Sequence, residues 1–159
     1  MSWIVMSLAF ICGHILLADS GCPLGWIKDG LSCYHFSHDT ESFVIADLLC
    51  KKMGGQLAEV NTEEESIFLA EHAANISHKF WIGLTDIDNE GDWRWYNSKA
   101  SLIQTNVTNW AKHEPDNTGD NENCAILGSH HGLWWDHSCH EFNRFVCEVE
   151  DESSVDVFG

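Results

Sequence analysis

The residues best suited to chemistry in this 159-residue chain lie in a polar loop. Between Trp110 and Cys124 almost every side chain is polar, and Glu114, Asp116 and Glu122 supply carboxylates. A long polar loop that ends at a cysteine is usually functional. The chain carries 25 Asp and Glu against 8 Lys and Arg, a formal net charge of −17. Most of these charges serve solubility, but the excess also suits hard cations, which prefer oxygen ligands, or a basic or mineral surface.

The same charge balance argues against two classes of partner. Nucleic acids and anionic lipid surfaces are bound by clustered Lys and Arg that displace counterions. With 8 such residues in the whole chain, we expect neither nucleic acid as a partner nor insertion into a membrane.

Histidines near the C-terminal end offer an alternative metal site. His130, His131, His137 and His140, together with Glu141, could hold Zn²⁺, which favours imidazole. No His-Glu-x-x-His pattern is present. We expect these side chains to be exposed or hydrogen-bonded rather than metal-bound, with pH-dependent ligand affinity as a further use.

Catalysis is the second function class to weigh. The chain contains no Gly-x-Ser-x-Gly or related nucleophile motif. Glu114 and Glu122 could imitate the carboxylate pair of a glycosidase, but cation binding explains them better. The chain is therefore not expected to be an enzyme.

The first twenty residues resemble a targeting segment. Residues 1–17 are apolar and uncharged, and small residues follow at Ala18 and Ser20. Such a run is too short to span a bilayer and fits a cleaved secretion signal, with a buried first helix as the alternative. Two glycosylation triplets, at Asn75 and Asn106, agree with export to a secreted, extracellular location.

Cleavage of residues 1–20 removes Cys12 and leaves six cysteines. An even number in a secreted chain implies three disulfides, although six cysteines alone permit 15 pairings. Six bonded sulfurs leave no catalytic thiolate. They are Cys22, Cys33, Cys50, Cys124, Cys139 and Cys147.

Two helices are predicted in the first half of the mature chain, after a short hairpin over residues 22–36. The first helix follows Glu41, is capped by Asp39 or Thr40, and stops at Gly54. The second begins at Thr62, which forms a capping box with Glu65. The residues predicted to face inward are Phe43, Ala46, Cys50 and Met53 in the first helix, and Ile67, Phe68, Ala70 and Ala74 in the second.

After Lys79 the pattern changes to short strands separated by polar loops. Aromatic and β-branched residues favour strands over 80–84, 93–96, 124–127 and 145–149. Residues 150–159 are acidic and polar, and a frayed tail is expected there.

These motifs resemble the C-type lectin-like domain family. The resemblance rests on Trp81-Ile82-Gly83-Leu84, on the order of the last four cysteines, on Glu114-Pro115-Asp116 followed by Glu122, and on Trp134-Trp135-Asp136 before Cys139. It covers residues 22–148 and is nearest to small secreted lectins of the perlucin-like kind.

The resemblance implies an α+β fold in which two helices flank two small antiparallel sheets and a long loop carries the ligand site. It pairs Cys50 with Cys147, Cys124 with Cys139, and Cys22 with Cys33, the last as in the long form of the domain. The implied organisation is a signal peptide at 1–20, a carbohydrate-recognition domain at 21–149 and an acidic tail at 150–159.

The resemblance also implies a calcium site. Glu114, Asp116, Glu122 and Asp136 match positions that coordinate the sugar-binding Ca²⁺, and Pro115 matches a proline preceded by a cis peptide. The family motif Trp-Asn-Asp here has Trp135 in place of Asn, so one oxygen ligand is missing. An auxiliary Ca²⁺ site matches Asp86, Glu90, Asn117, Glu122 and Asn123.

The implied function is calcium-dependent binding of glycans, free or on cell surfaces, in innate recognition of microbial or self glycans. The sugar-binding set is Glu114, Asp116, Glu122, Trp135 and Asp136. Trp135 either stacks on a sugar or packs against the protein, whereas Trp134 is expected in the core. Glu-Pro-Asp is neither the mannose-type nor the galactose-type pattern, so it predicts no specificity. Agglutination would require a homo-oligomer. The alternative is an acidic matrix, mineral-associated or protein-binding member without sugar binding.

Overall fold

The computed structural model describes residues 21–105 and 107–151. The predicted signal peptide at 1–20, the glycosylation acceptor Asn106 and residues 152–159 of the predicted tail lie outside the described residues. Asn75, the other predicted acceptor, is exposed near the end of the second helix.

The strands form one continuous sheet with the order β1-β2-β8-β4-β6-β7, to which β3 adds on β8 and β5 adds on β4. Neighbours are antiparallel except β4 and β8, which run parallel. The strands are β1 (Ile27–Asp29), β2 (Ser32–Phe36), β3 (Gln56–Leu57), β4 (Phe80–Thr85), β5 (Arg94–Trp95), β6 (Cys124–Leu127), β7 (Trp134–His137) and β8 (Arg144–Glu150).

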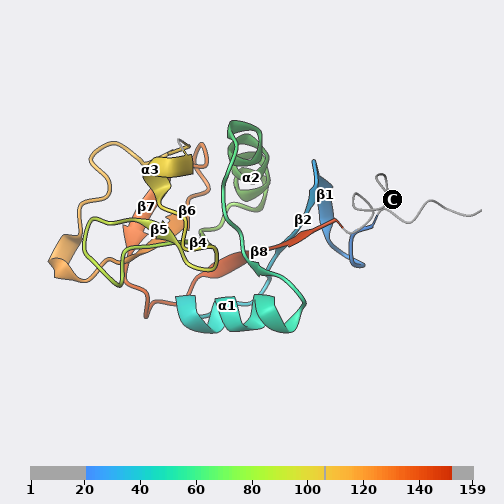
Figure 1. Cartoon of the computed structure of the whole chain (residues 1–159), viewed down its shortest axis with the longest axis horizontal. Coiled ribbons are helices and arrows are strands. Elements are labelled where there is room, and N and C mark those ends of the chain that lie inside the picture. Colours follow the sequence, from blue (N-terminus) through green and yellow to red (C-terminus); the bar gives the residue numbers. More distant parts are fainter. Residues whose placement is uncertain (1–20, 106, 152–159) are drawn as a thin grey trace, which may run out of the picture.

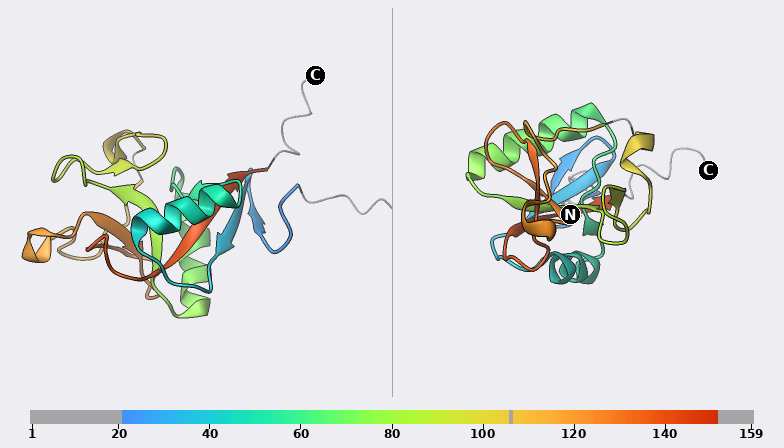
Figure 2. Two further views of the ribbon diagram at one scale, coloured as in Figure 1. Left: turned by 90° about the horizontal axis from the view of Figure 1, so that it is seen from below. Right: turned by 90° about the vertical axis from the view of Figure 1, so that its left-hand side faces the viewer.

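Two long helices flank this sheet. Helices α1 (Phe43–Lys52) and α2 (Glu63–Ile76) lie on opposite sides of β8, and the β1–β2 hairpin extends at one end (Figure 1). A short helix α3 (Leu102–Thr105) and the 3-10 turn η1 (Thr118–Asp120) lie at the other end (Figures 1 and 2). The predicted α+β fold is confirmed. It differs in detail, since the two expected sheets join through β4 and β8 and a third helix is present.

The alternation of side chains along β4 divides the core in two. Phe80, Ile82 and Leu84 face the cluster under α2, whereas Trp81 faces the cluster under α1. All six residues of β4 are buried, as expected for a strand that is covered on both faces. Trp134 belongs to the first cluster and is fully buried, which confirms the prediction that it packs in the core.

The helix predictions were right about existence and partly wrong in detail. Thr62 and Glu65 form the predicted capping box, with the Glu65 amide 3.1 Å from Thr62 Oγ1. The N-cap of α1, however, is Ser42 rather than Asp39 or Thr40. The amide of Phe43 donates to the Cys139 carbonyl at 3.1 Å, so a tertiary bond satisfies a donor that a side-chain cap would otherwise take.

The inward face of α2 also differs from the prediction. The buried residues are Ser66, Leu69 and Ala73, while Ile67 is 58% exposed. Phe68 packs at the edge of the core. The helix is thus turned by about one residue relative to the predicted face, because Leu69, absent from the predicted set, occupies the centre of the contact. In α1, Phe43, Ala46 and Cys50 are buried as predicted, but Met53 is 40% exposed.

The predicted strands 80–84, 124–127 and 145–149 correspond to β4, β6 and β8, and 93–96 shortens to β5. Two strands were missed, β3 and β7. The expected tail starts too early, since Glu150 belongs to β8 and Asp151 is fully buried, with its amide donating to the Leu31 carbonyl and its carboxylate paired with Lys28.

The three disulfides implied by the family resemblance are present. They join Cys22 to Cys33, Cys50 to Cys147 and Cys124 to Cys139. The second connects α1 to β8, and the third connects the start of β6 to the segment after β7. In the described part of the chain, no helix is long and apolar enough to cross a membrane.

Candidate cation and ligand site

Three carboxylates from two distant segments meet at the end of the sheet that is opposite the β1–β2 hairpin. Glu114 and Asp116 come from the polar loop and Asp136 from β7; one oxygen of each lies within 4.8 Å of the others. The burial of the three side chains ranges from the exposed Asp116 to Asp136, which is 3% exposed. The bond between Glu114 and Pro115 is cis, as the resemblance implied.

Asp136 holds the loop against the sheet. Its Oδ1 accepts a hydrogen bond from the Asp116 amide at 3.2 Å, and its Oδ2 accepts one from the Asn117 amide at 2.7 Å. Backbone pairing with Ala125 on β6 fixes Asp136 in turn. One buried carboxylate therefore both contributes to the acidic cluster and positions the loop that brings the other two acids.

The loop is also organised internally. Asp116 Oδ1 accepts from the amide and hydroxyl of Thr118, at 3.0 and 2.6 Å. Asn117 adopts a left-handed conformation with φ of 45°, which Asn tolerates better than most residues. Its Oδ1 accepts from the Glu122 amide at 3.0 Å. These short-range bonds give the loop a defined shape.

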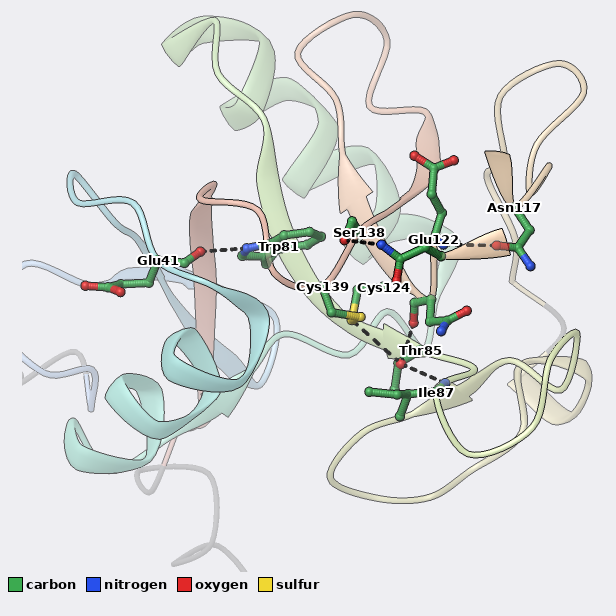
Figure 3. Close-up of a disulfide and its surroundings, with 11 residues drawn as sticks. Glu41, Trp81, Thr85, Ile87, Asn117, Glu122, Cys124, Ser138 and Cys139 are labelled. Atoms are coloured by element: carbon green, nitrogen blue, oxygen red, sulfur yellow. Dashed lines mark hydrogen bonds between the residues drawn. A yellow bond between two sulfur atoms is a disulfide. The ribbon is translucent and has the colours of Figure 1, made fainter. Parts of the chain in front are cut away.

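Glu122 lies outside the three-acid cluster, unlike its predicted placement. Its Oε2 accepts from the Thr118 amide at 3.0 Å, and its Oε1 lies 3.4 Å from His137 Nδ1. In Figure 3 the Glu122 side chain points away from the Cys124–Cys139 disulfide, beside Asn117. His137 also contacts Glu141, with Nε2 2.8 Å from Oε2.

The alternative Zn²⁺ site, which was considered but not expected from the sequence, is not assembled in the described part of the chain. Within residues 21–105 and 107–151, Glu114, Asp116 and Asp136 form the one group of at least three acidic, His or Cys side chains close enough to share an ion. His137 is engaged with Glu122 and Glu141, in agreement with the expectation of hydrogen-bonded histidines.

Like charges in the cluster perturb Glu114. Partial burial, followed by its contact with the Asp136 carboxyl and the charges of Asp116 and Glu122, raises the pKa of Glu114 to about 7. Adjacent carboxylates favour a shared proton unless a cation neutralises them. A divalent cation is thus the group that this donor set fits, since Ca²⁺ prefers carboxylate oxygens.

This perturbation predicts a pH dependence of ion binding. Because a protonated carboxyl is a poor ligand, calcium affinity is expected to fall as the pH is lowered from 8 to 6 through the Glu114 pKa of about 7. In the ion-free protein the free energy of unfolding changes with pH in the opposite direction. Because folding raises the pKa of Glu114 from 4.5 to about 7, the stability declines as the pH rises from 4.5 to 7. Calorimetric titration with Ca²⁺ at pH 6, 7 and 8 measures the first effect. Equal affinity at all three values would contradict it, and Glu114→Gln should flatten the profile.

Of the predicted auxiliary site, Asp86 and Glu90 lie in the loop after β4, whereas Asn117, Glu122 and Asn123 lie in the polar loop before β6. Asp86 is 3% exposed, and its Oδ2 accepts from the Gly91 amide at 2.8 Å, while its buried Oδ1 has no hydrogen-bond partner among the described residues. Desolvation raises the pKa of Asp86. Its amide donates to the Asn123 carbonyl at 3.3 Å, and Glu90 is exposed. An unpartnered buried carboxylate oxygen is consistent with a cation ligand.

The Cys124–Cys139 disulfide and Thr85 connect the two regions (Figure 3). Thr85 Oγ1 donates to the Asn123 carbonyl at 2.5 Å and accepts from the Ile87 amide at 3.1 Å. On the neighbouring segment, Asn121 Nδ2 donates to Ser138 Oγ at 3.0 Å. The far end of the polar loop is therefore tied to both β4 and the segment after β7.

A pocket of about 470 Å³ adjoins the acidic cluster, a volume within the range of small-molecule sites. Trp135, half-buried, forms part of its wall, and its indole packs against Gly128. The ring thus packs on the protein, as one of the two alternatives expected, and also lines the pocket; its stacking on a sugar stays a prediction.

Sequence reasoning missed several residues of this pocket, namely Lys79, Thr118, Ile126, Gly128 and Ser129. Lys79 and Gly128 occupy positions without a motif, and only the neighbouring strands bring them to the pocket. His130 and His137, which also line it, were considered only as ligands of Zn²⁺.

Known proteins are similar to this chain in sequence and architecture. Residues 39–149 match the family model described as the lectin C-type domain. Perlucin of Haliotis laevigata is 35% identical over 134 residues, which cover 82% of this chain and 84% of perlucin. Asialoglycoprotein receptor 2 of Rattus norvegicus is 38% identical over 132 residues, which cover 80% of this chain. The matched region spans 42% of that receptor's length.

Solved structures agree. The mouse scavenger receptor C-type lectin carbohydrate-recognition domain superposes with a TM-score of 0.77 at 35% identity, covering 83% of this chain and all of that one. A calcium-independent type II antifreeze protein, 21% identical with a TM-score of 0.70 over 81% of this chain and 94% of its own, shares the fold alone. From the family match and the similarity to perlucin over most of both chains, the protein belongs to the C-type lectin domain family.

Proposed function

We propose that this protein is a secreted, calcium-dependent lectin whose ion is held by Glu114, Asp116 and Asp136. The observation that carries the proposal is the convergence of these carboxylates from two segments, each with an oxygen within 4.8 Å of the others. Secretion is supported by the leader-like residues 1–20 and by three disulfides, which persist in oxidising compartments.

The side chains of the cluster fit a hard cation and then a polyol. When bound, Ca²⁺ would supply a centre that coordinates two neighbouring hydroxyl oxygens of a sugar. The carboxylates of Glu114 and Asp116 would accept hydrogen bonds from those hydroxyls. Asp136 holds the loop in place by accepting hydrogen bonds from the amides of Asp116 and Asn117. Glu122 and the auxiliary set of Asp86, Glu90, Asn117 and Asn123 are proposed as further calcium ligands.

The sugar class is proposed only at the level of a vicinal diol. Both ends of Glu114-Pro115-Asp116 carry acceptor-only side chains, and Trp135 supplies no amide donor or carbonyl to the diol. Orientation of the ring would therefore depend more on the pocket wall, including Trp135, than on amide hydrogen bonds. Glycan recognition in innate immunity, and a homo-oligomer with several sites, are proposed as the setting in which such binding acts.

Affinity chromatography separates this proposal from the matrix alternative, which the similarity to perlucin and the acidic composition keep open. We expect retention on at least one of mannose-, galactose- and N-acetylglucosamine-coupled resins in CaCl₂ and elution by EDTA. Retention on calcium carbonate that free sugar does not compete, with no retention on the resins, would favour the matrix function instead.

Replacing Trp135 by Asn is expected to strengthen calcium binding, because an amide carbonyl is added beside Asp136 where the family motif has it. The expected gain is about five- to tenfold in affinity, the size of one additional hydrogen-bond-like interaction with a charged group. Calcium titration measures it. Trp135→Phe is the matched control, since it adds no oxygen. An unchanged affinity in Trp135→Asn would show that this side chain does not reach the ion.

A further inference from the structure

Five of the eight Lys and Arg side chains form no ion pair within the described residues, namely Lys52, Lys79, Lys99, Lys112 and Arg144. Lys28, Lys51 and Arg94 are paired with Asp151, Asp47 and Asp92. The described residues form five ion pairs, and none of these includes Lys79 or Arg144. Lys79 and Arg144 differ from the other three unpaired cations in that both line one pocket, which gives this strongly acidic molecule a local basic surface.

The parallel pairing of β4 with β8 brings these two side chains to the same edge. Phe80, the first residue of β4, is in register with Arg144, the first residue of β8. Lys79 directly precedes Phe80 and is exposed, whereas Arg144 is half-buried. Both line a pocket of about 320 Å³, together with His38, His78 and Phe142.

Phe142 adds an apolar surface to this basic pocket, since it is 70% exposed. The nearest acidic residue in the backbone pairing is Glu41, which bridges to Asn143 through main-chain atoms. No ion pair joins Glu41 to Arg144 within the described part of the chain. The pocket therefore offers positive charge beside an aromatic ring, a combination suited to an anion on a partly apolar ligand.

The basic pocket adjoins the pocket beside the acidic cluster, because Lys79 lines both. The wall of the pocket beside the acidic cluster also includes Trp135 and His130. A Cβ at Gly128 would lie 2.1 Å from Trp135 Cζ3, so the absence of a side chain there lets the indole pack closely against the backbone that follows β6. An aromatic side chain in the wall of a pocket that also contains an ion site and a cation can accommodate a sugar ring.

We propose that the groove formed by these two adjoining pockets binds an acidic oligosaccharide. One sugar residue would lie at the Glu114–Asp136 cluster, the next along Trp135, and a carboxylate or sulfate of the ligand at Lys79 and Arg144. The inference rests on the proposed lectin function and defines its ligand class. The net charge of −17 does not oppose it strongly, since at physiological ionic strength charges farther than about 8 Å are largely screened. The local cations therefore decide the interaction.

The test uses matched sets of glycans on an array: a neutral di- or trisaccharide, the same glycan carrying one sulfate, and the same glycan carrying sialic acid. For any neutral parent that binds in CaCl₂, we expect at least one acidic form to bind about fivefold more tightly, the upper range for a partly exposed ion pair. The sulfate and sialic acid members distinguish the two sources of the anion.

The variant Lys79→Gln/Arg144→Gln should lose this fivefold preference. The matched control, Lys52→Gln/Arg94→Gln, removes the same two charges elsewhere and should keep it. Equal binding of neutral and acidic glycans by the unmodified protein, or a preference that survives in Lys79→Gln/Arg144→Gln, would overturn the inference. So would acidic-glycan binding that persists undiminished in EDTA, because the groove then would not extend the ion site. Binding of no glycan at all would instead refute the lectin function itself.

Discussion

Glu114→Gln is expected to weaken calcium binding by about 10- to 100-fold, or about 1.4–2.7 kcal/mol, and to abolish calcium-dependent retention on sugar resins. The substitution keeps the size of the side chain but removes one of the three clustered charges, and the loss corresponds to that of an interaction with a charged partner. Calorimetric titration with CaCl₂ at pH 8 measures the effect.

Two controls distinguish a lost ligand from a damaged fold. Asp120→Asn removes an exposed carboxylate from the same loop and should leave calcium affinity within about twofold, a change typical of a screened surface charge. In EDTA at pH 8, Glu114→Gln should unfold at the same temperature as the unmodified protein or a higher one, because it relieves repulsion from Asp136. A large fall in melting temperature, or unchanged affinity for Ca²⁺, would place the ion elsewhere.

Loss of the Cys50–Cys147 disulfide is expected to cause the largest change in stability. The two cysteines are 97 residues apart, and by the chain-entropy estimate closing such a loop stabilises by about 4.7 kcal/mol. In Cys50→Ala/Cys147→Ala, the melting temperature should fall by about 15 °C for a domain of this size. Differential scanning calorimetry on the oxidised proteins measures it.

The hairpin disulfide provides the comparison. Cys22 and Cys33 are 11 residues apart, so the same estimate gives about 2.8 kcal/mol. Cys22→Ala/Cys33→Ala should therefore be the milder variant. If the two double variants melted together, loop closure would not be the dominant contribution, and the cavities left around the fully buried Cys50, Cys147 and Cys33 would need to be weighed instead.

Features encoded by short-range chemistry were predictable from the sequence. The α2 start needs only Thr62 and the side chain and amide of Glu65, three residues away, and the structure contains that bond pattern. The start of α1 was not predictable in this way. It depends on a bond from the Phe43 amide to the carbonyl of Cys139, a partner almost a hundred residues along the chain.

Strand β7 was missed for a related reason. Trp134 to His137 contains two aromatic residues but no β-branched residue, and half of the segment is the polar pair Asp136 and His137, so its composition was ambiguous. The strand exists because it pairs with β6 over four consecutive residues, which in turn points Trp134 into the core and Trp135 toward the pocket. Its acid, Asp136, was nevertheless identified from the motif that it shares with the family.

The site was predictable as a set of residue types but not as a set of contacts. The resemblance pointed to Glu114, Asp116 and Asp136, which the fold brings together. It also pointed to Glu122. The Glu122 carboxylate instead contacts the Thr118 amide and His137, because the fold places these hydrogen-bonding groups next to it. The basic end of the groove had no sequence signal, since Lys79 and Arg144 become neighbours only through the parallel pairing of β4 and β8.

Calorimetry of the full mature protein tests the central claim most directly. Chelator-treated protein is titrated with CaCl₂, and the calcium-saturated and EDTA-treated forms are then each titrated with mannose, galactose, fucose and N-acetylglucosamine. The account predicts a saturable heat for the ion, and a saturable heat for at least one sugar in the presence of Ca²⁺ alone. Ion binding without heat from any sugar, or sugar binding unaffected by EDTA, would contradict it.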